Sequence, residues 1–212
     1  MSQNISIKVE KVSIKKVKTS LFISGKFKDE KVNKSLDDLL GITLKNAFNT
    51  DSFKSDFGKK IDLFSNGKIN KFSFYGLGDK NKLDSNKLRS LAANIVRNIE
   101  LNKISSVTID SNSFGLSNSL NAQAFTEGLL LGQYKFLDYK SKKTDFSLNE
   151  VIFIGDVDLK SLSKGQVIGE SVNYARDLGN HPANFLTPAY LANEAKEISK
   201  TKNFKIKVID VK

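Results

Sequence analysis

The chain has 212 residues, of which 39% are apolar, and a formal net charge of +11; this length suits one domain with a sizeable core, or one domain and part of another. No apolar run approaches the roughly 20 residues that a bilayer-spanning helix needs, and the absence of cysteine excludes disulfides and thiolate metal sites. Only Arg89, Arg97 and Arg176 are arginines, so the positive charge is mostly lysine, which argues against specific recognition of nucleic acid bases.

The first third of the chain mixes short strands with one helix. Apolar residues alternate with serine and lysine from Ile5 to Ile14, which predicts half-buried strands and an antiparallel opening. We expect a short buried strand over 21–23 and then a charged turn over 25–31. Apolar residues from Leu36 to Phe48 recur at helical spacing and predict one helix, in which Gly41 is a weak point.

Strands and helices alternate after this region. The Asn66-Gly67 pair between two apolar runs, 61–64 and 69–75, predicts a β-hairpin. The elements predicted next are a helix over 88–99, a strand over 104–109, a helix over 122–134 and a strand over 151–154. Such alternation predicts an α/β fold with a largely parallel sheet.

The stretch from Gly165 to Leu178 predicts a helix with one apolar face. The residues of that face are Val167, Ile168, Val172, Ala175 and Leu178. We expect this helix to stop near Gly179, because glycine tolerates the left-handed turn that caps a helix and Pro182 cannot continue it.

A second helix start follows at Thr187 and Pro188. The threonine hydroxyl can accept from free amides of the first turn, while proline has the backbone angle of a first helical residue. The residues predicted to line one face of this helix are Leu191, Ala195 and Ile198. Alternating apolar residues from Phe204 to Val211 predict a last strand.

Four features invite a chemical interpretation, and for each the structural alternative is stronger. Gly76-Leu77-Gly78 suggests a dinucleotide-binding turn, but Asn81 occupies the place of the third glycine, so we expect only a tight turn. His181 is the single histidine and receives no ligand role. Arg176 and Asp177 are expected to make separate structural contacts, and 139–143 is a solvated loop rather than a phosphate site.

Three motifs carry a family resemblance. They read YGLGDKNKLDSNKLRSLAANIVR, AFTEGLLLGQYKFLDYKSKK and ARDLGNHPANFLTPAYLANEA. Each is similar to a motif of the leucyl aminopeptidases, also called cytosol aminopeptidases, and all three occur in the family's order. The resemblance covers the chain from about Leu21 to Lys212 and is weakest before Asp62.

The resemblance implies a fold and a domain organisation. The implied fold is α/β: a macro-domain-like, mixed and largely parallel sheet flanked by helices, followed by linker helices. Residues 1–157 would form the amino-terminal macro-like domain, 158–200 the linker helices, and 201–212 the start of the catalytic peptidase domain.

The resemblance also implies an activity for the full-length family, which is hydrolysis of amino-terminal residues from peptides by two zinc or manganese ions. Their ligands are a lysine, three aspartates and a glutamate, the last pair in an N-T-D-A-E-G-R signature that this chain lacks. We therefore expect no catalytic, cofactor-binding or metal-binding residue here, and no activity from this chain alone. Its expected role is assembly and positioning, with its own carboxy-terminal catalytic domain as partner, in a hexamer.

The alternative is a stand-alone basic module that binds nucleic acid, because the net charge is high and amino-terminal domains of some bacterial relatives contribute to DNA binding. Lysine-dominated contacts would make such binding weak, indifferent to sequence and sensitive to salt. No membrane partner is expected. The amino terminus lacks the apolar core of a secretion signal, so the expected location is cytoplasmic.

Overall fold

The computed structural model describes residues 5–31, 34–40, 42–142, 146–202 and 204–209. The chain forms two compact units, residues 1–173 and 174–212. Among the described residues, no helix is long and apolar enough to cross a membrane.

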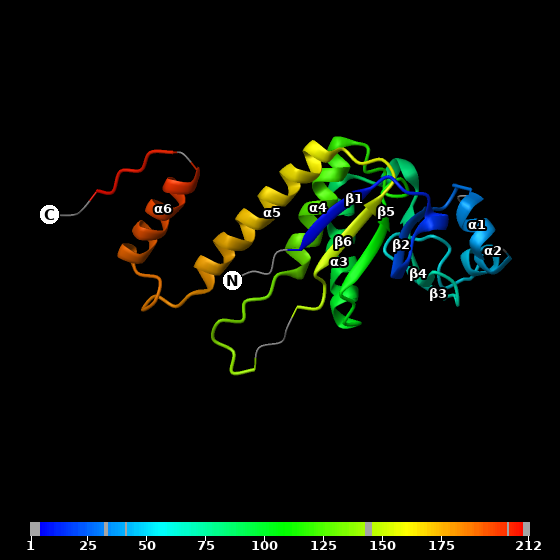
Figure 1. Cartoon of the computed structure of the whole chain (residues 1–212), viewed down its shortest axis with the longest axis horizontal. Helices are drawn as coiled ribbons and strands as arrows, with labels where there is room; N and C mark the ends of the chain where they lie inside the picture. The colour runs from blue at the N-terminus through cyan, green and yellow to red at the C-terminus, as the bar shows by residue number, and fades with distance from the viewer. Residues whose placement is uncertain (1–4, 32–33, 41, 143–145, 203, 210–212) are drawn as a thin grey trace. The chain divides into compact units, whose positions relative to one another are not determined.

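The first unit is built on a mixed sheet, shown with its helices in Figure 1. Its six strands among the described residues are β1 (Ser6–Glu10), β2 (Thr19–Phe27), β3 (Lys60–Phe64), β4 (Ile69–Gly78), β5 (Ser106–Asp110) and β6 (Glu150–Ile154). Their order across the sheet is β1-β6-β5-β2-β4-β3. All neighbours run parallel except β3, which forms the predicted antiparallel hairpin with β4. The predicted α/β fold with a largely parallel sheet is confirmed.

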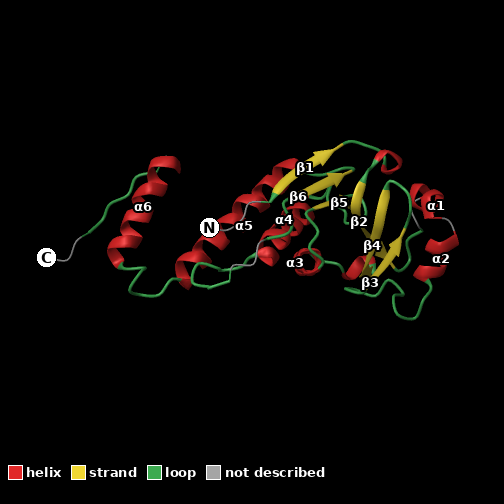
Figure 2. Ribbon diagram, turned by 60° about the horizontal axis from the view of Figure 1, so that its bottom comes forward, coloured by secondary structure: helices red, strands yellow, loops and turns green. Residues whose placement is uncertain are grey.

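Helices cover both faces of this sheet (Figure 2). The helices are α1 (Lys34–Leu40), α2 (Ile42–Phe48), α3 (Ser85–Leu101), α4 (Ser119–Gln133) and α5 (Leu159–Asn180), the last of which begins in the first unit and ends in the second. Strand β2 contributes to a core on each face of the sheet, because successive side chains of a strand point to opposite faces. Leu21 and Ile23 belong to the core under α3 and α4. Phe22 belongs to the core under α1 and α2. Burial on both faces explains the continuous apolar run over 21–23 within β2.

Helices α3 and α4 pack very closely, and the residues of the AFTEGLLLG motif make this possible. A Cβ atom on Gly128 would lie 2.2 Å from the carbonyl oxygen of Arg89, so only glycine fits there. One residue earlier, Glu127 accepts from the Arg89 Nε at 2.6 Å and ties the same two helices together. The motif therefore encodes a helix–helix contact.

The predicted apolar face of α5 is wrong. Val167 and Val172 are 62% and 40% exposed. The buried residues of α5 are Leu162, Gly165, Gly169 and Asn173. A Cβ on Gly165 would lie 2.5 Å from the Gln123 carbonyl oxygen of α4. The helix buries its small residues because close approach of the two backbones decides which side faces inward.

Three predictions near the amino terminus are also corrected. The opening is not antiparallel, since β1 pairs with β6 in parallel and Ile14–Lys16 form a short 3₁₀ helix. Strand β2 continues to Phe27, so the predicted charged turn over 25–31 starts too early. The single helix predicted over 36–48 is two helices, α1 and α2, and Gly41 lies outside the described residues.

The second unit contains the end of α5 and helix α6 (Pro188–Lys202). The Thr187 hydroxyl oxygen accepts from the Tyr190 amide at 3.2 Å, which confirms the predicted cap. The Tyr174 hydroxyl donates to Glu194 at 2.7 Å and joins the two helical segments. Residues 204–209 form no strand, so that part of the last predicted strand is wrong, whereas 210 and 211 lie outside the described residues.

Candidate functional site

The carboxyl ends of β2, β4 and β5 meet at one edge of the sheet. Strand β4, which the chain reaches after β3, lies on one side of β2, and β5 lies on the other side. In open α/β sheets, ligands bind beyond the carboxyl ends of the strands where the connections change direction in this way. Two adjoining cavities lie here and share Lys26, Glu30, Lys31 and Phe48 in their walls.

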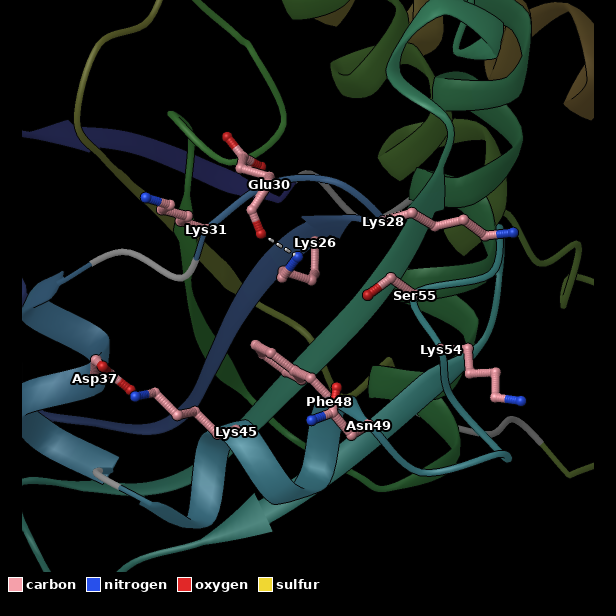
Figure 3. A pocket seen from close by; sticks show the side chains of 10 residues that line it. All are labelled: Lys26, Lys28, Glu30, Lys31, Asp37, Lys45, Phe48, Asn49, Lys54 and Ser55. Carbon is pink, nitrogen blue, oxygen red and sulfur yellow. Dashed lines mark hydrogen bonds between the residues drawn. The ribbon is translucent and has the colours of Figure 1, made fainter.

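The larger cavity has a volume of about 670 Å³ and a basic lining (Figure 3). Its described lining residues are Lys26, Lys28, Glu30, Lys31, Asp37, Lys45, Phe48, Asn49, Lys54 and Ser55. Lys28 pairs with Asp56 at 2.7 Å and Lys54 with Asp51 at 2.6 Å, so these two charges are largely offset. Figure 3 shows Lys45 extending toward Asp37 across the cavity.

Lys26 is the most buried of these lysines, with 8% of its surface exposed. Its ammonium donates to the carbonyl oxygen of Glu30 at 2.6 Å and to that of Phe27. It also lies 5.8 Å from the centre of the Phe48 ring. Burial lowers the pKa of Lys26, and the nearby carboxylates of Glu30 and Asp29 oppose this effect. The direct contacts of the Lys26 ammonium are thus two carbonyl oxygens and an aromatic ring, none of which is charged.

The smaller cavity, of about 220 Å³, contains a buried carboxylate. Asp110 ends β5, is 7% exposed, and accepts from the Ser24 hydroxyl at 3.2 Å. The Ser113 hydroxyl donates to the Asp110 carbonyl oxygen at 2.7 Å and accepts from the Gly25 amide at 2.8 Å. Burial raises the pKa of Asp110, although the bonds from Ser24 and from the amides of Ser113 and Asn112 act against it.

One wall of the larger cavity depends on Gly76. A Cβ at this position would lie 2.1 Å from the Asp56 carbonyl oxygen, so glycine lets the loop over 53–59 pack against β4. In that loop Lys54 and Ser55 have left-handed backbone angles, with φ of 39° and 51°. The predicted tight turn at Gly76-Leu77-Gly78 is therefore wrong, because these residues belong to the end of strand β4.

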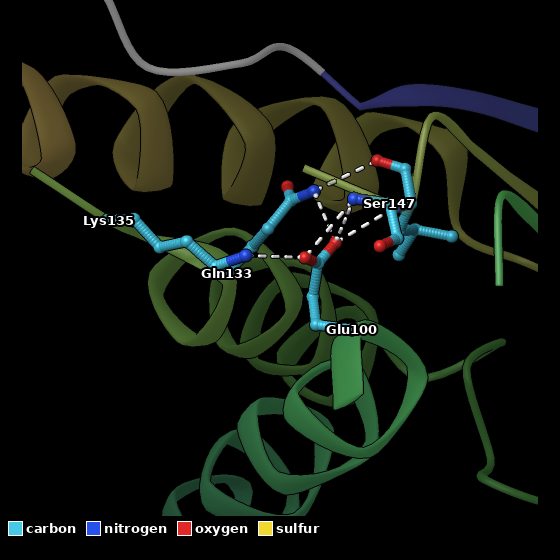
Figure 4. A network of polar contacts seen from close by, with 5 residues as sticks. Glu100, Gln133, Lys135 and Ser147 are labelled. Atoms are coloured by element: carbon cyan, nitrogen blue, oxygen red, sulfur yellow. Dashed lines mark hydrogen bonds and ion pairs between the residues drawn. The ribbon is translucent and has the colours of Figure 1, made fainter. Parts of the chain in front are cut away.

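A second buried polar cluster surrounds Glu100 at the end of α3 (Figure 4). Its carboxylate accepts from Lys135 Nζ at 2.7 Å, from the Leu148 amide at 2.8 Å and from the Ser147 amide at 3.1 Å. Gln133 donates to the Leu148 carbonyl oxygen at 2.9 Å. Because groups of the chain itself donate to this carboxylate, the role of the cluster is structural: it holds the segment before β6 against the end of α3.

The other sequence candidates lie outside these cavities. Tyr139 packs on Phe136 with ring centres 5.7 Å apart, and Lys143 lies outside the described residues. His181, in the second unit, lies against the Phe185 ring with centres 4.5 Å apart. Arg176 and Asp177 lie on the part of α5 that belongs to the same unit.

Sequence reasoning missed Lys26 and Asp110, which lie at the ends of buried strands. The sequence predicts a strand only over 21–23 and therefore places Lys26 in the charged turn predicted over 25–31. The signal was present, because Ser24-Gly25-Lys26-Phe27 continues the alternation of β2 between its two faces. Asp110 directly follows the apolar residues of β5. A charged residue at the carboxyl end of a buried parallel strand is a sequence signal for the ligand-binding edge of the sheet.

Comparisons with known proteins agree with the fold. Residues 20–143 match the cytosol aminopeptidase family, N-terminal domain. A probable cytosol aminopeptidase from Aquifex aeolicus is 34% identical over 165 residues, which cover 76% of this chain and 33% of that protein. The chain thus spans about a third of that relative.

Solved structures show the same architecture. A mutant of tomato leucine aminopeptidase has a TM-score of 0.78 at 21% identity, covering 95% of this chain and 43% of that one. The bottromycin maturation enzyme BotP in complex with Mn has a TM-score of 0.67 at 23% identity, covering 87% of this chain and 37% of that one. These structures share the fold, while the family match over 20–143 and the 34% identity to the Aquifex aeolicus relative show the family: the chain belongs to the cytosol aminopeptidase family, and residues 20–143 are its amino-terminal domain.

Proposed function

We propose that this chain is the non-catalytic portion of a metal-dependent aminopeptidase that removes amino-terminal residues from peptides. The observation that carries the proposal is the family match over 20–143, together with a relative of which the chain covers 33%. Hydrolysis then belongs to a carboxy-terminal catalytic domain of the full-length enzyme. The role of this chain is to assemble and position that domain.

The metal chemistry is proposed for the same catalytic domain. A two-metal site needs several clustered carboxylates or imidazoles. Within residues that the structure describes, no group of three or more His, Asp or Glu side chains could hold a metal ion. The solved complex of BotP with Mn supports manganese as a metal of that domain, and zinc is proposed beside it from the family resemblance.

The finer organisation follows from the family and is likewise proposed. Residues 1–157 form the amino-terminal domain, 158–200 the linker helices and 201–212 the start of the catalytic domain. The full-length enzyme assembles as a hexamer. Its location is cytoplasmic, in keeping with relatives named cytosol aminopeptidases.

The test compares this 212-residue chain with the protein translated from its whole reading frame. Both are assayed on a leucine anilide and analysed for bound metal. We expect no turnover and no stoichiometric zinc or manganese in the 212-residue chain, and both in a protein that includes the N-T-D-A-E-G-R signature. Turnover by the shorter chain that survives further purification would contradict the proposal.

The nucleic-acid alternative receives no support from the family match. Arg89 is engaged by Glu127 and Asn86, so it is poorly placed to bind a phosphate or a base. Weak DNA binding that falls steeply with salt remains a prediction, measurable by titrating labelled duplexes at several salt concentrations. Tight binding to one sequence at physiological salt would favour the alternative.

A further inference from the structure

Peptide hydrolysis in another domain leaves the cavities at the carboxyl ends of β2, β4 and β5 without a role. Together they offer about 670 Å³ and about 220 Å³ of adjoining space. Pockets of roughly 300–1,000 Å³ accommodate small organic ligands rather than polymers. The two cavities share Lys26 and Phe48, so one molecule can extend through both.

The larger cavity offers positive charge to a ligand. Among the described residues, Lys31 and Lys45 form no ion pair within 4 Å, unlike Lys28 and Lys54. Lys45 is directed toward Asp37 (Figure 3), whose carboxylate offsets part of the charge of this lining. An ammonium has three donors, and Lys26 uses two of them on the carbonyl oxygens of Phe27 and Glu30. One donor of Lys26 remains for a ligand. Figure 3 shows the side chain of Glu30 directed away from Lys26, so that carboxylate does not occupy it.

The smaller cavity offers a different chemistry. The Asp110 carboxylate has roughly four acceptor sites and receives the Ser24 hydroxyl and the amides of Asn112 and Ser113. It can accept a further donor, such as a hydroxyl or amino group. No ion pair within the described part of the chain joins Asp110 to Lys26, although both line this cavity. The apolar wall between the two ends comes from Phe48, Leu36 and Phe74.

We propose that these cavities bind one small phosphate ester, with its phosphate on Lys26, Lys31 and Lys45 and its hydroxyl or amino groups at Asp110. The lysines act as point charges of the kind that hold phosphate. The buried carboxylate repels a bare inorganic anion but accepts from the donor groups of a sugar or base. This division selects an ester over free phosphate. It also selects against nucleic acid, whose backbone needs an open groove.

The experiment measures binding to the 212-residue chain by isothermal titration calorimetry at physiological salt. The probes are ribose 5-phosphate, adenosine diphosphate, inorganic pyrophosphate and L-leucine. We expect at least one of the two esters to bind with one-to-one stoichiometry and more tightly than pyrophosphate. No peptide substrate is present, so the result is independent of aminopeptidase activity.

Matched variants place the binding in the cavity. Lys45→Ala removes an exposed helical lysine of the lining, and Lys164→Ala removes an exposed helical lysine of α5 that lines neither cavity. We expect Lys45→Ala to weaken ester binding roughly fivefold or more, the usual effect of losing one charged contact. Lys164→Ala should leave it unchanged. Equal melting temperatures of the two variants exclude unfolding as the cause.

A third variant tests the carboxylate end. Asp110→Asn keeps the shape of the side chain, and it should weaken ester binding while leaving pyrophosphate binding the same or tighter. Failure of both esters to bind, equal losses in Lys45→Ala and Lys164→Ala, or one-to-one binding of leucine in place of an ester would each overturn the proposal. If Asp110→Asn does not fold, the comparison of the two lysine variants still decides.

Discussion

Helix α3 in the first unit buries a continuous apolar stripe, whereas helix α6 in the second unit buries none of its described side chains. Both helices have an amphipathic sequence and a side-chain cap, on Asp84 for α3 and Thr187 for α6. The difference lies in their neighbours: α3 packs on a sheet and on α4, while Leu191 of α6 is 48% exposed. An isolated helix of this length is marginal in water. Amphipathic spacing therefore predicts a helix, but burial depends on what the rest of the protein supplies.

The largest expected effect is on amide hydrogen exchange. Core helices open only with global unfolding, whereas weakly packed segments open locally at little cost. We expect amides of Leu191–Ile198 in α6 to exchange at least roughly a thousandfold faster than those of Leu88–Ile99 in α3. Exchange measured by NMR or mass spectrometry on the 212-residue chain checks this. Equal protection of both helices would show that the second unit is an integral part of a single cooperative domain.

The parts of the fold that follow from sequence are those in which local pattern and packing agree. The sequence predicts the Asn66-Gly67 hairpin, α3, α4 and the start of α6 at Thr187 and Pro188, because turn residues, caps and apolar spacing agree there. The inward side of α5 could not be predicted. Its spacing favours Val167 and Val172, but Gly165 and Gly169 allow closer contact with α4, and this contact is visible only in the folded chain.

The site shows a similar division. The sequence contains Lys26 and Asp110, but the sheet order that makes their strands adjacent is a long-range property. The pairing of β2 with β5 joins residues more than 80 positions apart, and no local pattern encodes it. Local pattern also misplaced Gly76, because the requirement for glycine comes from the loop that carries Asp56 and not from a turn. Sequence motifs identify the family, and the structure was needed for the cavity.

A substitution in the contact between α3 and α4 should have the next largest effect. Gly128→Ala would place a methyl group 2.2 Å from the Arg89 carbonyl oxygen. This oxygen belongs to the backbone of α3, so it cannot move away unless the helix shifts. We expect a loss of about 2–3 kcal/mol in the free energy of unfolding, at the upper end for overpacking. Denaturant titration monitored by circular dichroism measures it.

The control for this change is Gly179→Ala on α5. Apart from its chain neighbours and the backbone of its own helix, no atom lies within 4 Å of the position of its added Cβ, and alanine is the better helix former. The free energy of unfolding should stay the same or rise slightly. If Gly128→Ala proved as harmless as Gly179→Ala, the close packing of α3 on α4 would be wrong.

The Glu100 cluster should give a smaller, pH-dependent effect confined to the first unit. Burial alone would raise the pKa of Glu100, but Lys135 and the amides of Leu148 and Ser147 outweigh it and hold the pKa below its ordinary 4.5. A depressed pKa stabilises the fold above the unfolded value, and this contribution is lost as pH falls through the folded pKa. Glu100→Gln should therefore cost about 1–2 kcal/mol at pH 7 and progressively less below pH 4.5. Urea unfolding at several pH values tests this, and a cost independent of pH would exclude the charge as its cause.

The smallest expected effect concerns the second unit, through the contact between Tyr174 and Glu194. Burial and the bond to Glu194 raise the pKa of Tyr174 to about 12. A raised tyrosine pKa stabilises the neutral form, so its contribution is complete below pH 10, the ordinary value, and is lost as pH rises toward 12. Because the side chain is only half-buried, so that water still reaches it, Tyr174→Phe should cost only about 0.5–1 kcal/mol. This loss should speed amide exchange in α6 a few fold and leave exchange in α3 unchanged.

Raising the pH toward 12 should loosen α6 in the wild-type chain more than in the variant, as followed by tyrosine absorbance and circular dichroism. A change in α3 protection on Tyr174→Phe would instead mean that the two units unfold together.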